Sequence, residues 1–281
     1  ETDLTVVCLE KNCFRIISSA AVRTHDKAHI LKHLSKDLEF KDVTDELVCL
    51  GIFGPKSRDL LSKITQDDLS NENFKFSTSK NIKLNSINVW AQRLSYVGEL
   101  GYEIYIQKEN AKEIYDLIVN TGKNFGLTHC GAHTMDTMRM ESGFLHWGHD
   151  ISPEENQYQA GLNFAISYKK PFDFIGKENL LKIKDQKLER RFVMMVLKDN
   201  TPGKPLLLHE EPIYLDDNIV GKTTSGNYSF NYNKNLSFGY INSQFSNEQL
   251  VDKNLYIEIE KKKYPAELLI KPLKMHNFKD I

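Results

Sequence analysis

The sequence has 281 residues, of which 37 are basic and 38 acidic, and its formal net charge of −1 excludes proteins that bind nucleic acid through overall basic charge. No apolar run approaches the roughly 18 residues of a membrane-spanning helix, and the length predicts about two domains. The four cysteines form no CxxC pair, so neither a disulfide scaffold nor a structural zinc site is expected, and a reducing, cytosol-like compartment is favoured.

The first part of the chain alternates short strands and helices. Apolar, β-branched runs at 4–9 and 14–17, on either side of Lys11 and Asn12, predict a β-hairpin. Apolar residues at helical spacing predict a helix over 24–38. Further strands and helices are predicted, in chain order, at 47–53, 57–64, 82–94, 102–106 and 111–120. This alternation predicts an α+β architecture with split βαβ units.

From residue 192 onward the pattern changes to short strands separated by turn residues. These strands are predicted at 192–197, 213–215, 236–241 and 255–259. Their spacing predicts a small antiparallel β-barrel. The charged stretch before them places a domain boundary there, giving domains at 1–185 and 186–281.

Two short segments in this part are predicted as turns. Thr224-Ser225-Gly226 does not match the GxSxG motif of hydrolases, and it reads as a turn that leads into a strand. Lys261-Lys262-Lys263 is predicted as a solvated hairpin turn, not as a patch that binds nucleic acid.

The common motifs for phosphate and metal binding are absent from the sequence. It contains no P-loop and no GxGxxG. Histidines four residues apart occur at 25, 29 and 33 and at 129 and 133, but no HExxH accompanies them, and no metal site is predicted.

The stretch 93–103 is unusually rich in glycines, tyrosines and carboxylates, among them Tyr96, Glu99 and Glu103. Glycines allow the backbone to approach a ligand closely, and one carboxylate accepts two parallel N–H bonds. The simpler interpretation is a tight turn with exposed glutamates.

A second dense stretch, 138–150, contains Arg139 and Trp147. A helix is predicted to end at Gly143, and an aromatic-rich loop follows. Trp147 beside Gly148 could form the wall of a site for a planar ligand; the alternative is a contact between domains. The residues alone thus predict a two-domain protein with a site for a flat, polar ligand.

Several motifs in a fixed order carry a family resemblance. They are Asp3-Leu4-Thr5-Val6, Gly54-Pro55-Lys56-Ser57-Arg58, the stretch 95–103, His146-Trp147-Gly148-His149-Asp150 and the stretch 171–177. With them the sequence resembles the aminomethyltransferases, the T-proteins of the glycine cleavage system. It resembles most closely the folate-binding C-terminal portion of the dimethylglycine and sarcosine dehydrogenases. These relatives have further N-terminal residues and, in the dehydrogenases, a flavin domain, so the start at Glu1 is interpreted as that of an N-terminally incomplete chain.

The resemblance implies roles for six residues. Asp3 matches an aspartate that the family places near N10 of the folate, which makes it the expected catalytic residue. Of the two candidates for the pterin ligand, Glu103 is preferred to Glu99. Tyr96 is expected to line the same site, and Trp147 to pack near the folate channel. Arg139 is expected either to be structural or to face folate carbonyl groups.

The resemblance also implies a reaction, in which tetrahydrofolate and an iminium derived from an N-methylated amine give 5,10-methylenetetrahydrofolate. An upstream flavin domain, absent from this chain, would carry FAD and supply the iminium. Met135 stands where T-proteins have an arginine, which favours the dehydrogenases. A T-protein proper, acting with a lipoylated partner, and a non-catalytic folate-binding relative are the alternatives. Neither nucleic acid nor a membrane is expected as a partner, and the expected compartment is the cytoplasm, or the mitochondrial matrix in a eukaryote.

Overall fold

The computed structural model describes residues 2–242, 245–251 and 253–274. The chain forms two compact units, the first ending at Met135 and the second beginning at Asp136, and each is described by itself. Within the described ranges no helix is long and apolar enough to cross a membrane.

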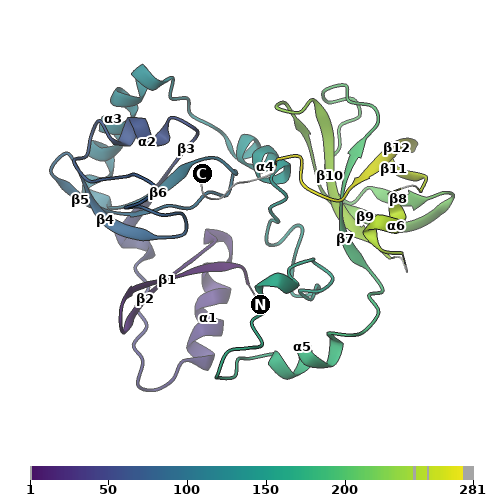
Figure 1. Ribbon diagram of the computed structural model, residues 1–281, viewed down its shortest axis with the longest axis horizontal. Helices are drawn as coiled ribbons and strands as arrows, with labels where there is room; N and C mark the ends of the chain where they lie inside the picture. Colours follow the sequence, from purple (N-terminus) through teal and green to yellow (C-terminus); the bar gives the residue numbers. More distant parts are fainter. Residues whose placement is uncertain (1, 243–244, 252, 275–281) are drawn as a thin grey trace. The chain divides into compact units, whose positions relative to one another are not determined.

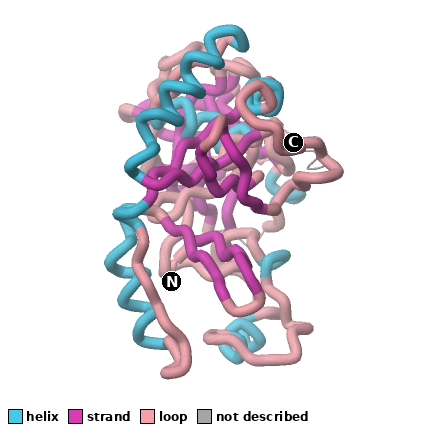
Figure 2. Tube along the Cα trace, turned by 90° about the vertical axis from the view of Figure 1, so that its left-hand side faces the viewer, coloured by secondary structure: helices cyan, strands magenta, loops and turns pink. Residues whose placement is uncertain are grey.

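The first unit begins with the predicted hairpin, which extends as its own two-stranded ribbon (Figures 1 and 2). Strands β1 (Leu4–Glu10) and β2 (Cys13–Ser18) pair in antiparallel fashion. Helix α1 (Arg23–His33) follows and ends five residues before the predicted position, because Leu34 already has extended backbone angles. The prediction of a helix up to residue 38 was therefore wrong at its C-terminal end.

A four-stranded sheet in the order β3-β6-β5-β4 forms the centre of the first unit. Its elements are β3 (Leu47–Phe53), helix α2 (Ser57–Leu61), β4 (Ser79–Leu84), β5 (Ile87–Gln92), β6 (Gly101–Gln107) and helix α3 (Ala111–Gly122). All neighbouring strands are antiparallel. Strands β3 and β5 therefore run in the same direction with β6 between them, in agreement with the predicted split arrangement.

The two faces of this sheet differ in polarity because successive side chains of a strand point to opposite sides. One face carries residues such as Ile52, Ile82 and Ile104, which form a buried core with α2 and α3. Figure 1 shows these two helices on the same side of the sheet. The other face carries polar and aromatic residues of β3, β5 and β6 and holds the candidate site.

The second unit contains a closed six-stranded antiparallel barrel, which confirms the predicted fold class. Its strands are β7 (Arg191–Leu197), β8 (Pro212–Leu215), β9 (Asn218–Ser229), β10 (Lys234–Ile241), β11 (Leu255–Ile259) and β12 (Lys262–Leu269). Helices α5 (Lys177–Ile183) and α6 (Asn247–Leu250) lie in this unit, and α4 (Ala132–Glu141) includes the last residues of the first unit and the first residues of the second. Short 3₁₀ turns lie along the chain at Ala20–Val22, Thr44–Glu46, Lys108–Asn110, Lys123–Phe125 and Asn163–Ala165. Alternating side chains of the barrel strands fill its interior.

The prediction of a turn at Thr224-Ser225-Gly226 was wrong, because these residues lie within β9, where Ser225 and Gly226 pair with β10 and Thr224 lies at a shift in the register. Glycine is needed there for close packing: a Cβ on Gly226 would collide with Leu207. The hairpin turn predicted for the lysine run is confirmed at Lys261, which has φ of 65° between β11 and β12, whereas Lys262 and Lys263 already belong to β12. The boundary at 185/186 stays a prediction.

Candidate functional site

Two rows of side chains cross the polar face of the sheet in the first unit. Glu103 on β6 lies directly opposite Gly51 on β3 and Gln92 on β5. In the next row Tyr105 lies between Cys49 and Trp90. Directly opposed residues share a face and have Cβ atoms about 4.5–5.5 Å apart. Glu103 and Gln92 are therefore close neighbours on one surface.

The Glu103 carboxylate is oriented by the next residue on the same face. The hydroxyl of Tyr105 donates a hydrogen bond of 2.7 Å to Glu103 Oε2. Burial and this hydrogen bond raise the pKa of Tyr105, so the phenol keeps its proton and acts as a donor. A carboxylate held by one oxygen still offers acceptor positions to a ligand with adjacent N–H groups.

Gln92 is the unusual member of this surface. Gln92 is 3% exposed, and its Oε1 atom is buried without a hydrogen-bond partner in the described structure. Buried polar side-chain atoms nearly always have a partner, because an unmade hydrogen bond costs about 1–3 kcal/mol. A free acceptor therefore lies beside the Glu103 carboxylate.

Aromatic rings flank these polar groups. The ring of Phe53 lies against Gly51 and Gly101, where a Cβ on either glycine would collide with it. The rings of Trp90 and Tyr105 are 4.8 Å apart. The surface around Glu103 thus combines hydrogen-bonding groups with flat apolar walls, as small-molecule sites commonly do.

The hairpin contributes one residue to the same surface. The guanidinium of Arg15 on β2 lies 4.4 Å from the centre of the Trp90 ring, a cation–π contact. Its Nη1 atom is buried and has no hydrogen-bond partner among the described residues. A free donor thus accompanies the free acceptor of Gln92.

The loop before β6 is held by its own hydrogen bonds. The hydroxyl of Ser95 accepts from the backbone N–H groups of Val97 and Glu99, at 3.3 and 3.2 Å, and Gly98 turns the chain with φ of 65°. The carbonyl of Leu100 accepts from the hydroxyl of Ser57 at 3.1 Å. The interpretation as a tight turn thus holds for this loop, whereas Glu103 lies beyond it on the sheet.

Tyr96 and Glu99 are half-buried in this loop. Glu103, by contrast, lies in the row that contains Gln92. The position on the sheet face therefore favours Glu103 over Glu99 as the ligand-binding carboxylate.

Asp3 immediately precedes β1; the residue as a whole is exposed, although its carboxyl group is partly buried. Its neighbour Thr2 donates a hydrogen bond of 3.1 Å to the buried carboxylate of Asp26, which fixes the chain at this point. Partial burial of the carboxyl group raises the pKa of Asp3. Such a shift brings an aspartate closer to the range in which it exchanges protons at neutral pH.

Arg139, in the second unit, is fully buried and is bound by residues of its own unit. Its guanidinium donates to the Asp136 carboxylate at 2.7 Å, the Phe144 carbonyl at 3.0 Å and the Ser225 hydroxyl at 2.7 Å, and it forms an ion pair with Asp150. These contacts favour the structural alternative for Arg139 over a direct contact with folate.

Trp147 lies in the loop that the ion pair between Arg139 and Asp150 holds in place. Asp150 accepts from the backbone N–H of His146 at 3.0 Å, and Gly148 N–H donates to the Ile151 carbonyl at 2.8 Å. The indole is half-buried. The loop is therefore a rigid support for Trp147.

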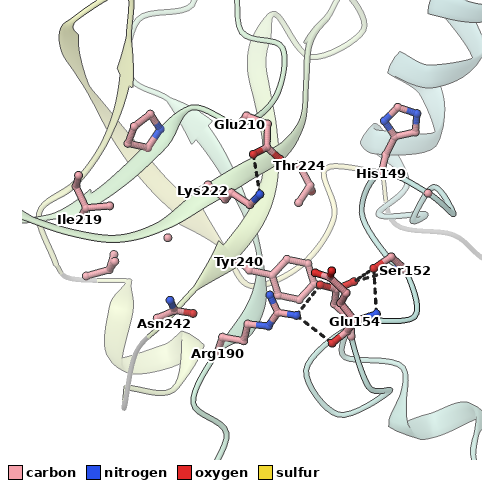
Figure 3. A pocket seen from close by; sticks show the side chains of 15 residues that line it. His149, Ser152, Glu154, Arg190, Glu210, Ile219, Lys222, Thr224, Tyr240 and Asn242 are labelled. Atoms are coloured by element: carbon pink, nitrogen blue, oxygen red, sulfur yellow. Dashed lines mark hydrogen bonds and ion pairs between the residues drawn. The ribbon is translucent and has the colours of Figure 1, made fainter.

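An open pocket of about 660 Å³ lies in the second unit (Figure 3). Its charged side chains largely pair with one another: Arg190 with Glu155, and Lys222 with Glu210, both at 2.6 Å. None of the six predicted site residues lines it. Tyr240 also lines this pocket, and its buried hydroxyl has no partner among the described residues.

The structure thus places Asp3, Tyr96, Glu99 and Glu103 in the first unit, and Arg139 and Trp147 in the second. Sequence reasoning did not single out Gln92, Arg15 or Phe53. Gln92 and Phe53 lie on the face of Glu103 through strand register, and Arg15 lies against Trp90 through the position of the hairpin, which neither composition nor a local motif reveals.

Comparison with known proteins gives consistent matches over the whole chain. The GCVT N-terminal domain model matches residues 1–170, and the glycine cleavage T-protein C-terminal barrel domain model matches residues 190–274. Human mitochondrial dimethylglycine dehydrogenase is 37% identical over 96% of the chain, which spans only 31% of that protein. An aminomethyltransferase of Alkaliphilus metalliredigens is 29% identical over 99% of the chain and 73% of its own length.

Among solved structures, the aminomethyltransferase T of the glycine cleavage system from Bartonella henselae has the same fold. Its TM-score is 0.81 at 19% identity, with 97% of this chain and 72% of that chain covered.

Proposed function

Because the chain belongs to the glycine cleavage T-protein family, we propose that it binds tetrahydrofolate and forms 5,10-methylenetetrahydrofolate. The one-carbon unit would come from the iminium of an N-methylated amine, as in a dimethylglycine or sarcosine dehydrogenase. A flavin domain outside this sequence, with FAD, would produce that iminium. The identity to dimethylglycine dehydrogenase over nearly the whole chain supports this choice.

The position of Glu103 carries the proposal. Its carboxylate lies on a sheet face with Gln92 and with the rings of Phe53 and Trp90. A pterin has adjacent N–H donors at N3 and at the 2-amino group, which suit one carboxylate. The flat rings suit a planar heterocycle, so the residues present fit this ligand.

The chain's own residues would then divide the work. Tetrahydrofolate supplies the nucleophilic nitrogen. Glu103 would orient the pterin, and Phe53 and Trp90 would exclude water, which otherwise turns an iminium into free formaldehyde. Asp3 would exchange a proton at N10, and the raised pKa of its carboxyl group suits that role.

The remaining predicted residues would act at other points. Tyr96 and Glu99 would shape the loop before β6. Arg139 would act through the loop that it fixes around Trp147, and so would be a positioning residue in this proposal.

A second candidate function is that of a T-protein, which takes an aminomethyl group from a lipoylated partner. The match over 73% of a bacterial aminomethyltransferase favours it. A glycine cleavage assay that depends on the lipoylated partner separates the two. A non-catalytic folate binder would bind folate and show neither activity.

The test is titration of the full-length protein with tetrahydrofolate, followed by calorimetry. Glu103→Gln is expected to weaken binding at least tenfold, because a charged acceptor of two hydrogen bonds is lost. Glu109→Gln, at an exposed position of the same segment, is the matched control and keeps full affinity. Absence of binding by the wild-type protein would refute the proposal.

The catalytic part is tested with Asp3→Asn. This variant is expected to bind tetrahydrofolate normally and to lose formation of 5,10-methylenetetrahydrofolate when the amine and the flavin domain are supplied. Unchanged activity would show that Asp3 does not handle the proton.

A further inference from the structure

We propose that Gln92 and Arg15 complete the binding site around Glu103 and make it selective for the edge of a ring that carries N–H donors together with a carbonyl acceptor. The aminolactam edge of a pterin has this chemistry. The inference rests on the proposed function and extends it to two residues with no assigned role.

Two polar atoms without hydrogen-bond partners among the described residues, one on Gln92 and one on Arg15, belong to the surface around Glu103. Gln92 lies directly opposite Glu103. Trp90 is two residues earlier on β5, so it shares the face of Gln92, and Arg15 lies 4.4 Å from the Trp90 ring. Gln92 Oε1 and Arg15 Nη1 are both buried without partners in the part of the chain that the structure describes.

The hydrogen-bonding chemistry of Glu103, Gln92 and Arg15 restricts the kind of ligand that fits. A carboxylate and an amide oxygen only accept hydrogen bonds, whereas a guanidinium only donates them. Together they require a ligand with at least two N–H donors and one acceptor. A simple anion would be repelled by Glu103 and would leave Gln92 unpaired, and an alkylammonium would leave Arg15 unpaired.

The competing explanation is structural. A small rotation could let Arg15 donate to Gln92, so that the pair only fastens the hairpin to the sheet. The two explanations predict opposite effects of Gln92→Leu on stability. Loss of a structural partner lowers the melting temperature, whereas removal of an amide whose buried oxygen has no partner among the described residues leaves it unchanged or raises it.

The experiment compares two probes, tetrahydrofolate and its analogue without the 2-amino group, by calorimetry on the full-length protein. Gln92→Leu is expected to keep or raise the melting temperature and to weaken tetrahydrofolate binding about tenfold, the effect of one hydrogen bond. Its affinity for the analogue should not change. Gln107→Leu, an exposed residue on the same face of β6, is the control.

Arg15→Met is the second variant, and it retains an apolar side chain over Trp90. Arg15→Met is expected to weaken the binding of both probes by a similar factor, since both carry the ring carbonyl. Lys11→Met, in the hairpin turn, is expected to leave the binding of both probes unchanged. Normal wild-type binding with no loss in Gln92→Leu, or an equal loss for both probes, overturns the inference alone. No binding by the wild-type protein overturns the proposed function and this inference with it.

Discussion

Replacement of Arg139 by methionine is expected to destabilise the second unit by about 3–5 kcal/mol, the cost of breaking one side of a buried ion pair. Arg139 and Asp150 are 0% and 1% exposed. Methionine fills much of the same volume, so the loss would come from charge and hydrogen bonding rather than from a cavity.

The size of the expected loss of stability follows from the hydrogen bonds that the Asp150 carboxylate keeps in the variant. This carboxylate would still accept from the His146 backbone N–H at 3.0 Å and from the Thr224 hydroxyl at 2.6 Å, but it would lose its ion pair with Arg139. At about 2–4 °C per kcal/mol for a protein of this size, the melting temperature should fall by roughly 10 °C.

The assay is urea unfolding followed by tryptophan fluorescence. The chain has two tryptophans, Trp90 in the first unit and Trp147 in the second, so a Trp90→Phe background reports on the second unit. Arg139→Met combined with Asp150→Leu should recover most of the loss, because no buried charge is then left unpaired.

Lys198→Met is the matched control, since it removes an exposed pair with Glu267 in the same unit and should cost less than 1 kcal/mol. A loss of less than 1 kcal/mol in Arg139→Met, or a double variant that is no more stable than the single one, would contradict this expectation. An Arg139→Met protein of normal stability that fails to bind tetrahydrofolate would instead indicate a direct contact with the ligand.

Three further predictions concern stability. Burial raises the pKa of Asp26, but hydrogen bonds from neighbouring side chains outweigh this effect and lower the pKa below its usual value. The ionised carboxylate therefore stabilises the folded state above the unfolded pKa of about 3.9, and this stabilisation is lost as the pH falls below that value. Asp26→Asn should flatten the acid limb of unfolding curves measured from pH 7 to 2. Gly221→Ala should cost more than 1 kcal/mol in urea unfolding because its Cβ would collide with the Tyr240 carbonyl, whereas Gly131→Ala, with open space around it, should be neutral. Tyr240→Phe removes a buried hydroxyl without a described partner, so calorimetry should show an unchanged or higher melting temperature.

The elements of the fold were largely predictable because their periodicity is strong. The strand Leu47–Phe53 was predicted to the residue, and the hairpin and four of the six barrel strands agree within a few residues, whereas β9 and β12 were not predicted as strands. The helix before the sheet was predicted too long because Leu34 and Leu38 continue the apolar spacing, although the backbone at Leu34 is already extended. Local spacing cannot report where tertiary contacts end a helix.

The candidate site was predictable only in part. Glu103 could be named because its motif is local, but Gln92 becomes its neighbour through the register of β5 on β6. Thr224 and Ser225 were interpreted as turn residues, yet their hydroxyls bind Asp150 and Arg139 from within a strand. Contacts between distant segments depend on register, and a single residue of slip would move each side chain to the opposite face.

Buried polar groups are used differently on the two surfaces that the sequence singled out. In the second unit the charges of Arg139 and Glu141 are bound by their own chain, Glu141 accepting from Ser229 at 2.7 Å and from Asn231 at 2.8 Å. Around Glu103, by contrast, an acceptor on Gln92 and a donor on Arg15 have no such partners among the residues that the structure describes. Because unmade buried hydrogen bonds reduce stability, a ligand that supplies both partners would explain why these two side chains occur together.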